Sequence, residues 1–142
     1  MTPNPLRSAA LATILVVSAA VAASTSQAAP APLHFSAVVY GKHTSSDGDF
    51  SSHERLSANG KRAGEDFSRC SRVDGGHDYK CSGSYTLTHG TIDFSGVIPA
   101  ARNSNTLNIT GGTGSYKNAR GHVHTVYNAA GTRATETITF SG

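Results

Sequence analysis

Alternation of apolar and polar residues at period two is the feature that most constrains this chain. After Pro32, each periodic segment alternates in this way, is rich in Thr, Val, Ile, Tyr and Phe, and ends at Gly, Asn or Asp. A period of two places successive side chains on opposite faces of a β-strand, whereas a helix needs a longer period. The pattern predicts an all-β protein with eight strands, over residues 33–40, 50–56, 62–72, 78–88, 91–98, 106–110, 122–127 and 132–140.

Eight short strands with turns at these spacings are typical of a barrel or a sandwich. Closing the strands into a barrel removes the exposed edges that they would otherwise present. We therefore expect a single domain, residues 33–142, folded as an eight-stranded antiparallel β-barrel.

The first 28 residues have the pattern of a secretory signal peptide. Arg7 is the only charged residue before a largely apolar run at 9–23, and Ser26-Gln27-Ala28 offers the small residues that a signal peptidase reads. The run is too short to span a bilayer comfortably. We expect residues 1–28 to be removed and residues 29–32 to form a short Ala/Pro linker, so that the mature protein is secreted and has no membrane partner.

The charge balance gives little support to nucleic-acid binding. The chain has 12 Lys and Arg against 9 Asp and Glu, and Arg7 leaves with the signal peptide. The remaining excess of positive charge is small, and the aromatic residues do not interleave with a basic stripe. We expect no nucleic-acid partner.

The Gly75-Gly76 turn sets the register of the strands on either side of it. A hairpin centred there places Cys70 opposite Cys81, at a separation within disulfide range. Because an exported protein meets oxidising conditions, we expect the two cysteines to pair. The same register places Asp66 opposite Tyr85.

The next turn predicts which aromatic side chains share the inner face. A two-residue turn at His89-Gly90 pairs Leu87 with Ile92 and Tyr85 with Phe94. Apolar side chains then meet on one face, and we expect Tyr85 and Phe94 to line the interior where a ligand would bind.

The last hairpin carries a carboxylate on its apolar face. Asn128 and Gly131 suit a three-residue loop, which pairs His124 with Glu136 and makes His124 a candidate ligand contact. A four-residue loop would instead place Glu136 opposite Val123. In either register Glu136 shares its face with apolar neighbours on its own strand.

Three acids, Glu54, Asp66 and Glu136, fall on faces that the apolar spacing marks as inward. A buried carboxyl group without a partner is costly, so it is either hydrogen-bonded or has a raised pKa. A raised pKa suits a general acid near neutral pH, and these three are the candidate catalytic residues. The alternative is that each acid accepts a structural hydrogen bond or meets water at a barrel mouth.

Two histidines two apart, His122 and His124, could join Glu136 in a metal site if they faced inward. This spacing is common by chance in a chain with 7 His, and solvated histidines explain it equally well. We expect neither a metal nor a cofactor.

Residues 111–121 contain four glycines and have the sequence Gly-Gly-Thr-Gly-x-Tyr-x-x-Ala-Arg-Gly. A phosphate-binding loop would open a helix, but a strand pattern follows Gly121. The stretch resembles the signature of the allene oxide cyclase barrel superfamily, which includes the plant dirigent proteins. The elements Asn59-Gly60-Lys61 and Cys81-x-Gly-x-Tyr-x-Leu-x-x-Gly-x-Ile agree with that resemblance.

The resemblance implies an eight-stranded barrel with a largely apolar cavity that steers the cyclisation or coupling of a reactive small molecule without a cofactor. It also implies that Tyr116 and Arg120 occupy the aromatic and arginine positions of the motif, as candidate ligand contacts, and that a homo-oligomer is possible. Two alternatives stay open: a lipocalin-like carrier that catalyses nothing, and a disulfide-stapled structural protein whose function lies on loops such as 41–49.

Overall fold

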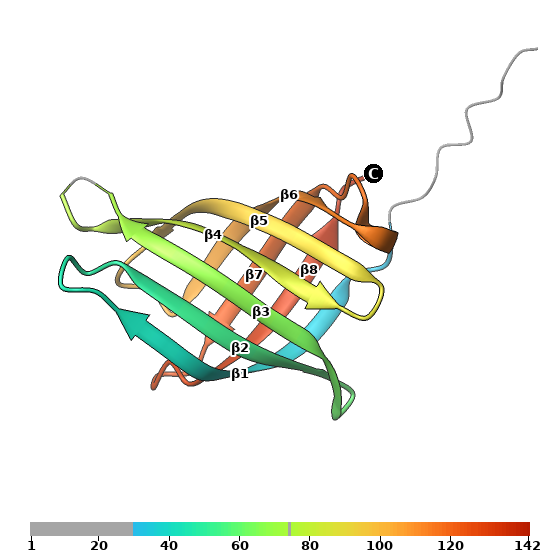
Figure 1. Cartoon of the computed structure of the whole chain (residues 1–142), viewed down its shortest axis with the longest axis horizontal. Coiled ribbons are helices and arrows are strands. Elements are labelled where there is room, and N and C mark those ends of the chain that lie inside the picture. Colours follow the sequence, from blue (N-terminus) through green and yellow to red (C-terminus); the bar gives the residue numbers. More distant parts are fainter. Residues whose placement is uncertain (1–29, 74) are drawn as a thin grey trace, which may run out of the picture.

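Eight antiparallel strands close into a barrel in which each strand pairs with the next and β8 returns to β1 (Figure 1). The computed structural model describes residues 30–73 and 75–142, so the predicted signal peptide at 1–28 lies outside the described residues. The elements in chain order are β1 Leu33–Thr44, β2 Phe50–Ala58, β3 Lys61–Arg72, β4 Asp78–Leu87, β5 Gly90–Pro99, β6 Ser104–Gly112, the 3₁₀ helix η1 Gly114–Tyr116, β7 Gly121–Tyr127 and β8 Arg133–Phe140. The predicted all-β barrel is confirmed.

The first strand runs four residues beyond its predicted end at Tyr40. The register of the β1 and β2 pair shifts between Val39 and Gly41, and pairing then continues to Thr44 opposite Phe50. The extension is polar on both faces, so hydrophobic periodicity does not mark it. No helix in the described part of the chain is long and apolar enough to cross a membrane.

The register around the Gly75-Gly76 turn is confirmed. Cys70 pairs with Cys81 across β3 and β4, their Cα atoms are 4.1 Å apart, and the two form a disulfide. Asp66 lies opposite Tyr85 in the same pair of strands.

The register predicted between β4 and β5 is wrong by two residues. Tyr85 pairs with Ile92, and Phe94 lies opposite Gly83. Gly90 is not a turn residue but starts β5, where its α-carbon packs so close to the backbone of Thr113 that a Cβ would lie 2.1 Å from that carbonyl oxygen. A shift of two residues keeps every side chain on its predicted face.

The register predicted for the last hairpin is also wrong. Glu136 lies opposite Thr125, whereas His124 lies opposite Thr137. The hydrogen bond from Asn128 N to Arg133 O leaves residues 129–132 in the loop, which therefore ends one residue later than in either predicted register. The Asn128 side chain holds this turn, because it accepts hydrogen bonds from the backbone N–H groups of Thr132 and Arg133. His124 therefore lies on the outer, exposed face.

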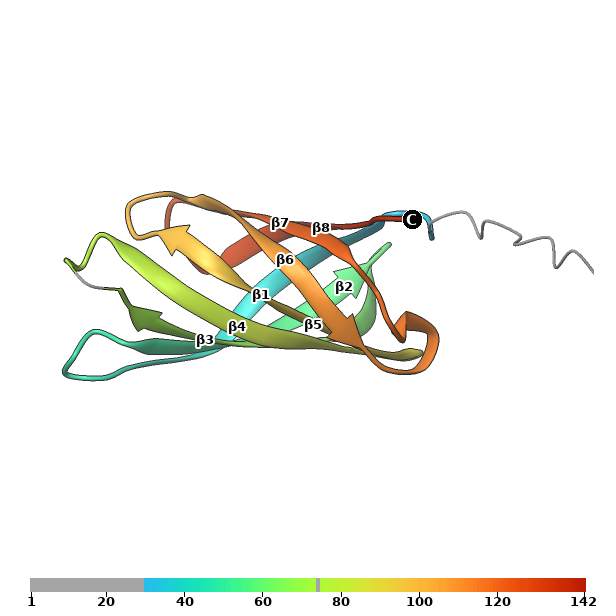
Figure 2. The same ribbon diagram turned by 90° about the horizontal axis from the view of Figure 1, so that it is seen from above.

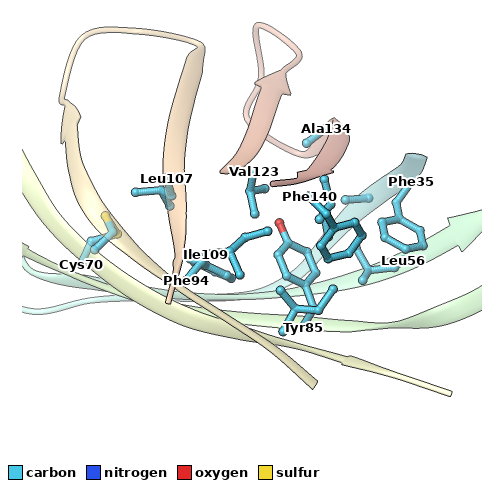
Figure 3. Packing of buried hydrophobic residues seen from close by; sticks show 14 residues of the cluster. Phe35, Leu56, Cys70, Tyr85, Phe94, Leu107, Ile109, Val123, Ala134 and Phe140 are labelled. Atoms are coloured by element: carbon cyan, nitrogen blue, oxygen red, sulfur yellow. A yellow bond between two sulfur atoms is a disulfide. The ribbon is translucent and has the colours of Figure 1, made fainter. Parts of the chain in front are cut away.

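The two ends of the barrel differ. At the end where β1 starts and β8 finishes, the interior is packed with apolar side chains, and η1 covers it with Tyr116 stacked against Phe140. Figure 3 shows the buried side chains, with Phe35, Leu56 and Phe140 gathered on one side and Cys70 and Leu107 on the other. The opposite end, on the left of Figures 1 and 2, carries the loops that follow β1, β3, β5 and β7. The members of the packed end are Phe35, Leu56, Ile92, Ile109, Ile138 and Phe140.

Candidate active site

A cavity of about 380 Å³ fills the half of the barrel below these loops. Its walls combine apolar groups, such as Phe94, Leu107 and the Cys70–Cys81 disulfide, with a few polar ones. The lining residues include two buried acids, Asp66 and Glu136, and two tyrosines, Tyr85 and Tyr127. The interior is therefore a pocket, not a filled core, which disfavours the purely structural alternative.

Three carboxyl groups meet in the barrel interior, and two of them, Asp66 and Glu136, line this cavity. Glu54 on β2 lies opposite Asp66 on β3, and Glu136 reaches the same place from β8. One oxygen of each lies within 4.8 Å of the others, and the three residues are 0%, 4% and 1% exposed, respectively. The prediction that all three acids point inward is correct, and the fold brings them together.

Hydroxyl groups donate hydrogen bonds to only some of the carboxyl oxygens in this cluster. The Tyr127 hydroxyl donates to Oε1 of Glu54 at 2.8 Å, and the Ser52 hydroxyl donates to the same oxygen at 3.3 Å. The Tyr85 hydroxyl acts on Glu136 and lowers its pKa. One buried oxygen of each acid, namely Oε2 of Glu54, Oδ1 of Asp66 and Oε2 of Glu136, has no protein partner.

Burial and mutual repulsion determine the protonation of the cluster. Burial, followed by repulsion from Glu136 and Glu54, raises the pKa of Asp66 to about 9. Burial and repulsion from Glu54 raise the pKa of Glu136 to about 8, against the lowering effect of the Tyr85 hydroxyl. Burial also raises the pKa of Glu54, although the hydroxyls of Tyr127 and Ser52 oppose it. The cluster therefore retains protons at neutral pH.

A cluster of this kind can both donate and accept a proton. A protonated carboxyl at the cavity floor can transfer a proton to an oxygen or nitrogen of a bound molecule, and a neighbouring carboxylate can remove one. Adjacent carboxyl groups with separated pKa values are a recurring basis for such acid and base roles. No Lys, Arg or His among the described residues forms an ion pair with the three acids.

Comparisons with known proteins support the fold assignment. No family model and no curated protein matches the sequence. Solved structures do match, among them a pyocyanin demethylase (TM-score 0.70, 20% identity, 78% of this chain and 100% of that one), an exo-specific intermolecular Diels-Alderase (0.64, 12%, 80% and 100%) and a pterocarpan synthase dirigent protein (0.55, 14%, 78% and 82%). The fold is that of the allene oxide cyclase and dirigent barrels. At these identities the likeness extends to the fold alone.

The glycine-rich motif through which the sequence resembles these barrels lies away from the cavity. Tyr116 packs on Phe140 at the closed end, and Arg120 donates hydrogen bonds to the backbone oxygens of Thr110 and Ala119. Neither side chain lines the cavity, so their predicted role as ligand contacts is not supported by their position. The motif instead closes one end of the barrel.

The aromatic pair predicted to line the interior does so. Tyr85 and Phe94 both line the cavity, with ring centroids 5.1 Å apart. His124 lies outside the barrel and hydrogen-bonds to Thr106, so it contacts no ligand in the cavity.

The sequence did not identify Tyr127 and Ser52 as site residues. The predicted register of the last hairpin was wrong by one residue, and such an error exchanges the two faces of β7, so Tyr127 was assigned to the outer face. The alternation Val123, Thr125, Tyr127 was the available signal. Ser52 lies two residues before Glu54 on the same face of β2, and that spacing alone could have suggested it.

His122 and His124 lie on the outer face while Glu136 faces inward, so the three residues do not form the His-based metal set that their spacing would have allowed. The oxygens of Glu54, Asp66 and Glu136 are close enough together to hold a metal ion. Carboxylate oxygens suit hard cations such as Ca²⁺ or Mg²⁺, but such a cation would have to displace the protons that the cluster retains.

Proposed function

We propose that this protein is a secreted barrel that binds an apolar or aromatic small molecule in its cavity and directs its cyclisation or coupling without a cofactor. One observation carries the proposal: three buried carboxyl groups lie together, and two of them, Asp66 and Glu136, line a pocket with largely apolar walls beside two tyrosines. The N-terminal signal-like segment and the disulfide support export.

In a cyclisation or isomerisation, the acids at the cavity floor would transfer protons. The apolar walls would hold the substrate in a conformation that can react. Asp66 or Glu136 donates a proton to a substrate oxygen or nitrogen as the new ring forms. A neighbouring carboxylate then removes a proton from the product, so the cluster regains its starting state. The walls hold the flexible molecule in a reactive conformation and exclude water.

The structural neighbours agree with this class of ligand. Their names describe a demethylase of pyocyanin, a Diels-Alderase and a pterocarpan synthase. Each name refers to chemistry on a small organic molecule, and pyocyanin is itself an aromatic heterocycle. A barrel of the same fold with an acid cluster at its floor suits similar reactants.

The test begins with native mass spectrometry of protein purified from culture supernatant, to find a retained small molecule. Wild type, Asp66→Asn and Glu136→Gln are then incubated with that molecule, or with pyocyanin, conjugated dienes and phenols, and products are followed by mass spectrometry. We expect the wild type to turn over one of them and both variants to lose turnover while still binding it. Unchanged turnover in both variants would contradict the catalytic role. Binding without turnover in the wild type would identify a carrier.

A further inference from the structure

Positive charges gather at the mouth of the cavity. Lys42 on β1, Arg72 at the end of β3 and Arg102 in the loop after β5 all line it. The acids that line it are Asp66 and Glu136, and both are buried at the floor. Along its length the described cavity wall therefore changes from cationic at the mouth to acidic at the floor.

Two of these cations lie over aromatic rings. The Lys42 Nζ atom is 5.3 Å from the Phe50 ring centroid, and the Arg72 Cζ atom is 5.8 Å from that of Tyr79. The two rings meet edge to face with centroids 5.0 Å apart. Cation–π contacts of this kind orient the cations without neutralising their charge.

No acidic side chain among the described residues forms an ion pair with Lys42, Arg72 or Arg102, the three cations at the rim of the cavity. Asp49, on the loop beside it, accepts a hydrogen bond from the backbone N–H of Arg72, not from the guanidinium. Among the residues that the structure describes, the only ion pair joins Arg62 to Glu65. The three rim cations thus remain available to an anionic group at the mouth.

We propose that the ligand is an amphiphilic anion: an aromatic or polyene body with a carboxylate or sulfonate at one end, and a proton-accepting oxygen or nitrogen at the other. The anionic end stays at the mouth beside Lys42, Arg72 and Arg102, and the acceptor meets the acid cluster. The opposite orientation is disfavoured, since it would add a negative charge to a buried acid cluster and leave the cations at the mouth without an anion. This inference rests on the proposed function, because it names the ligand class of the same cavity.

Two fluorescent probes that differ chiefly in one anionic group test it. 8-Anilinonaphthalene-1-sulfonate carries a sulfonate, whereas N-phenyl-1-naphthylamine has the same aromatic body without it. Both are titrated at neutral pH and low salt against wild type, Lys42→Gln, Arg72→Gln and Arg102→Gln. Arg69→Gln is the matched control, because it removes the same charge from the outer wall, where Arg69 lies over Phe67.

We expect the wild type to bind the sulfonate probe about tenfold more tightly than the uncharged one. Each of the three substitutions at the rim should weaken binding of the sulfonate probe by roughly threefold. The uncharged probe and Arg69→Gln should show no change. Equal binding of the two probes, or no effect of the rim variants, would overturn the anionic ligand class while leaving the cavity proposal intact. A cavity-filling Leu107→Trp variant separates the two proposals: if it displaces neither probe, both bind elsewhere, and the proposed cavity site itself fails.

Discussion

Glu54 and Asp66 face each other across β2 and β3, both almost completely buried. Two ionised carboxylates this close in an apolar interior would repel strongly, so the folded state favours their protonated forms. Glu136 lies beside the same pair, and Asp66 and Glu136 line the cavity. The groups that lower the stability of the fold are thus the same groups to which we assign the proposed proton transfer.

The acid cluster predicts that stability falls as pH rises. Unfolded carboxyl groups ionise near pH 4, whereas Asp66 and Glu136 have pKa values of about 9 and about 8 when folded. Between these limits the folded protein holds protons that the unfolded chain has released, so rising pH favours unfolding. Each retained proton contributes a slope of about 1.4 kcal/mol per pH unit.

Denaturant unfolding across this pH range measures that slope. We expect Asp66→Asn to reduce the slope by the contribution of one proton, about 1.4 kcal/mol per pH unit. The variant should also be more stable than the wild type at the upper end of the pH range. Asp47→Asn, the same change in an exposed loop, should leave the slope as it is. A wild-type free energy of unfolding that does not fall between pH 5 and pH 8, a window taken from these pKa values, would contradict the protonated cluster.

Gly83 is expected to tolerate no side chain. A Cβ there would lie 2.3 Å from the Phe67 backbone oxygen and 2.4 Å from Cζ of Phe94. Gly83→Ala should therefore destabilise the protein by about 1–3 kcal/mol. Gly41→Ala is the control, because its nearest contact would be an ordinary 3.5 Å to His53. Equal stability of the two variants would show that β4 can move to make room.

The disulfide between Cys70 and Cys81 should stabilise the fold by roughly 2–3 kcal/mol, because it restricts the unfolded chain over a short loop. The double variant Cys70→Ser, Cys81→Ser is expected to unfold at correspondingly lower denaturant concentration. Reduced wild type should approach the same value, and untreated protein should show no free thiol once unfolded. A free thiol in the secreted protein would contradict the pairing.

Tyr127→Phe removes one hydroxyl donor from Glu54 and leaves Ser52 as its recorded partner. We expect a loss of about 1 kcal/mol in the free energy of unfolding, typical of a single hydrogen bond. The pKa of Glu54 should rise further, since that hydroxyl lowers it. Tyr40→Phe makes the same change on the outer wall, where Tyr40 is 49% exposed, and should be neutral.

Much of the fold follows from local sequence signals. Period two identifies every strand, and the turn at Gly75-Gly76 fixes the disulfide register and the placement of Asp66 opposite Tyr85. The inward acids follow from the same alternation, because Glu136 keeps its face whichever register its hairpin takes.

Two hairpin registers could not be predicted, one because it depends on a contact distant in sequence and the other because it depends on a side-chain hydrogen bond within the loop. Gly90 is held by the backbone of Thr113, and the last loop depends on how the Asn128 side chain bonds the backbone after it. The convergence of Glu54 with Glu136 needs barrel closure, since their strands are far apart in the chain but both neighbour β1. The cavity likewise depends on how side chains from all the strands fill the interior.

The protonation of the cavity floor is the central claim, and carbon-13 NMR measures it directly. Protein labelled at the Asp and Glu carboxyl carbons is titrated, and Asp66→Asn, Glu136→Gln and Glu54→Gln assign the signals. We predict that Asp66 titrates near pH 9 and Glu136 near pH 8. If all three acids ionise near pH 4, like carboxyl groups in water, the cluster is charged at neutral pH and the account is wrong.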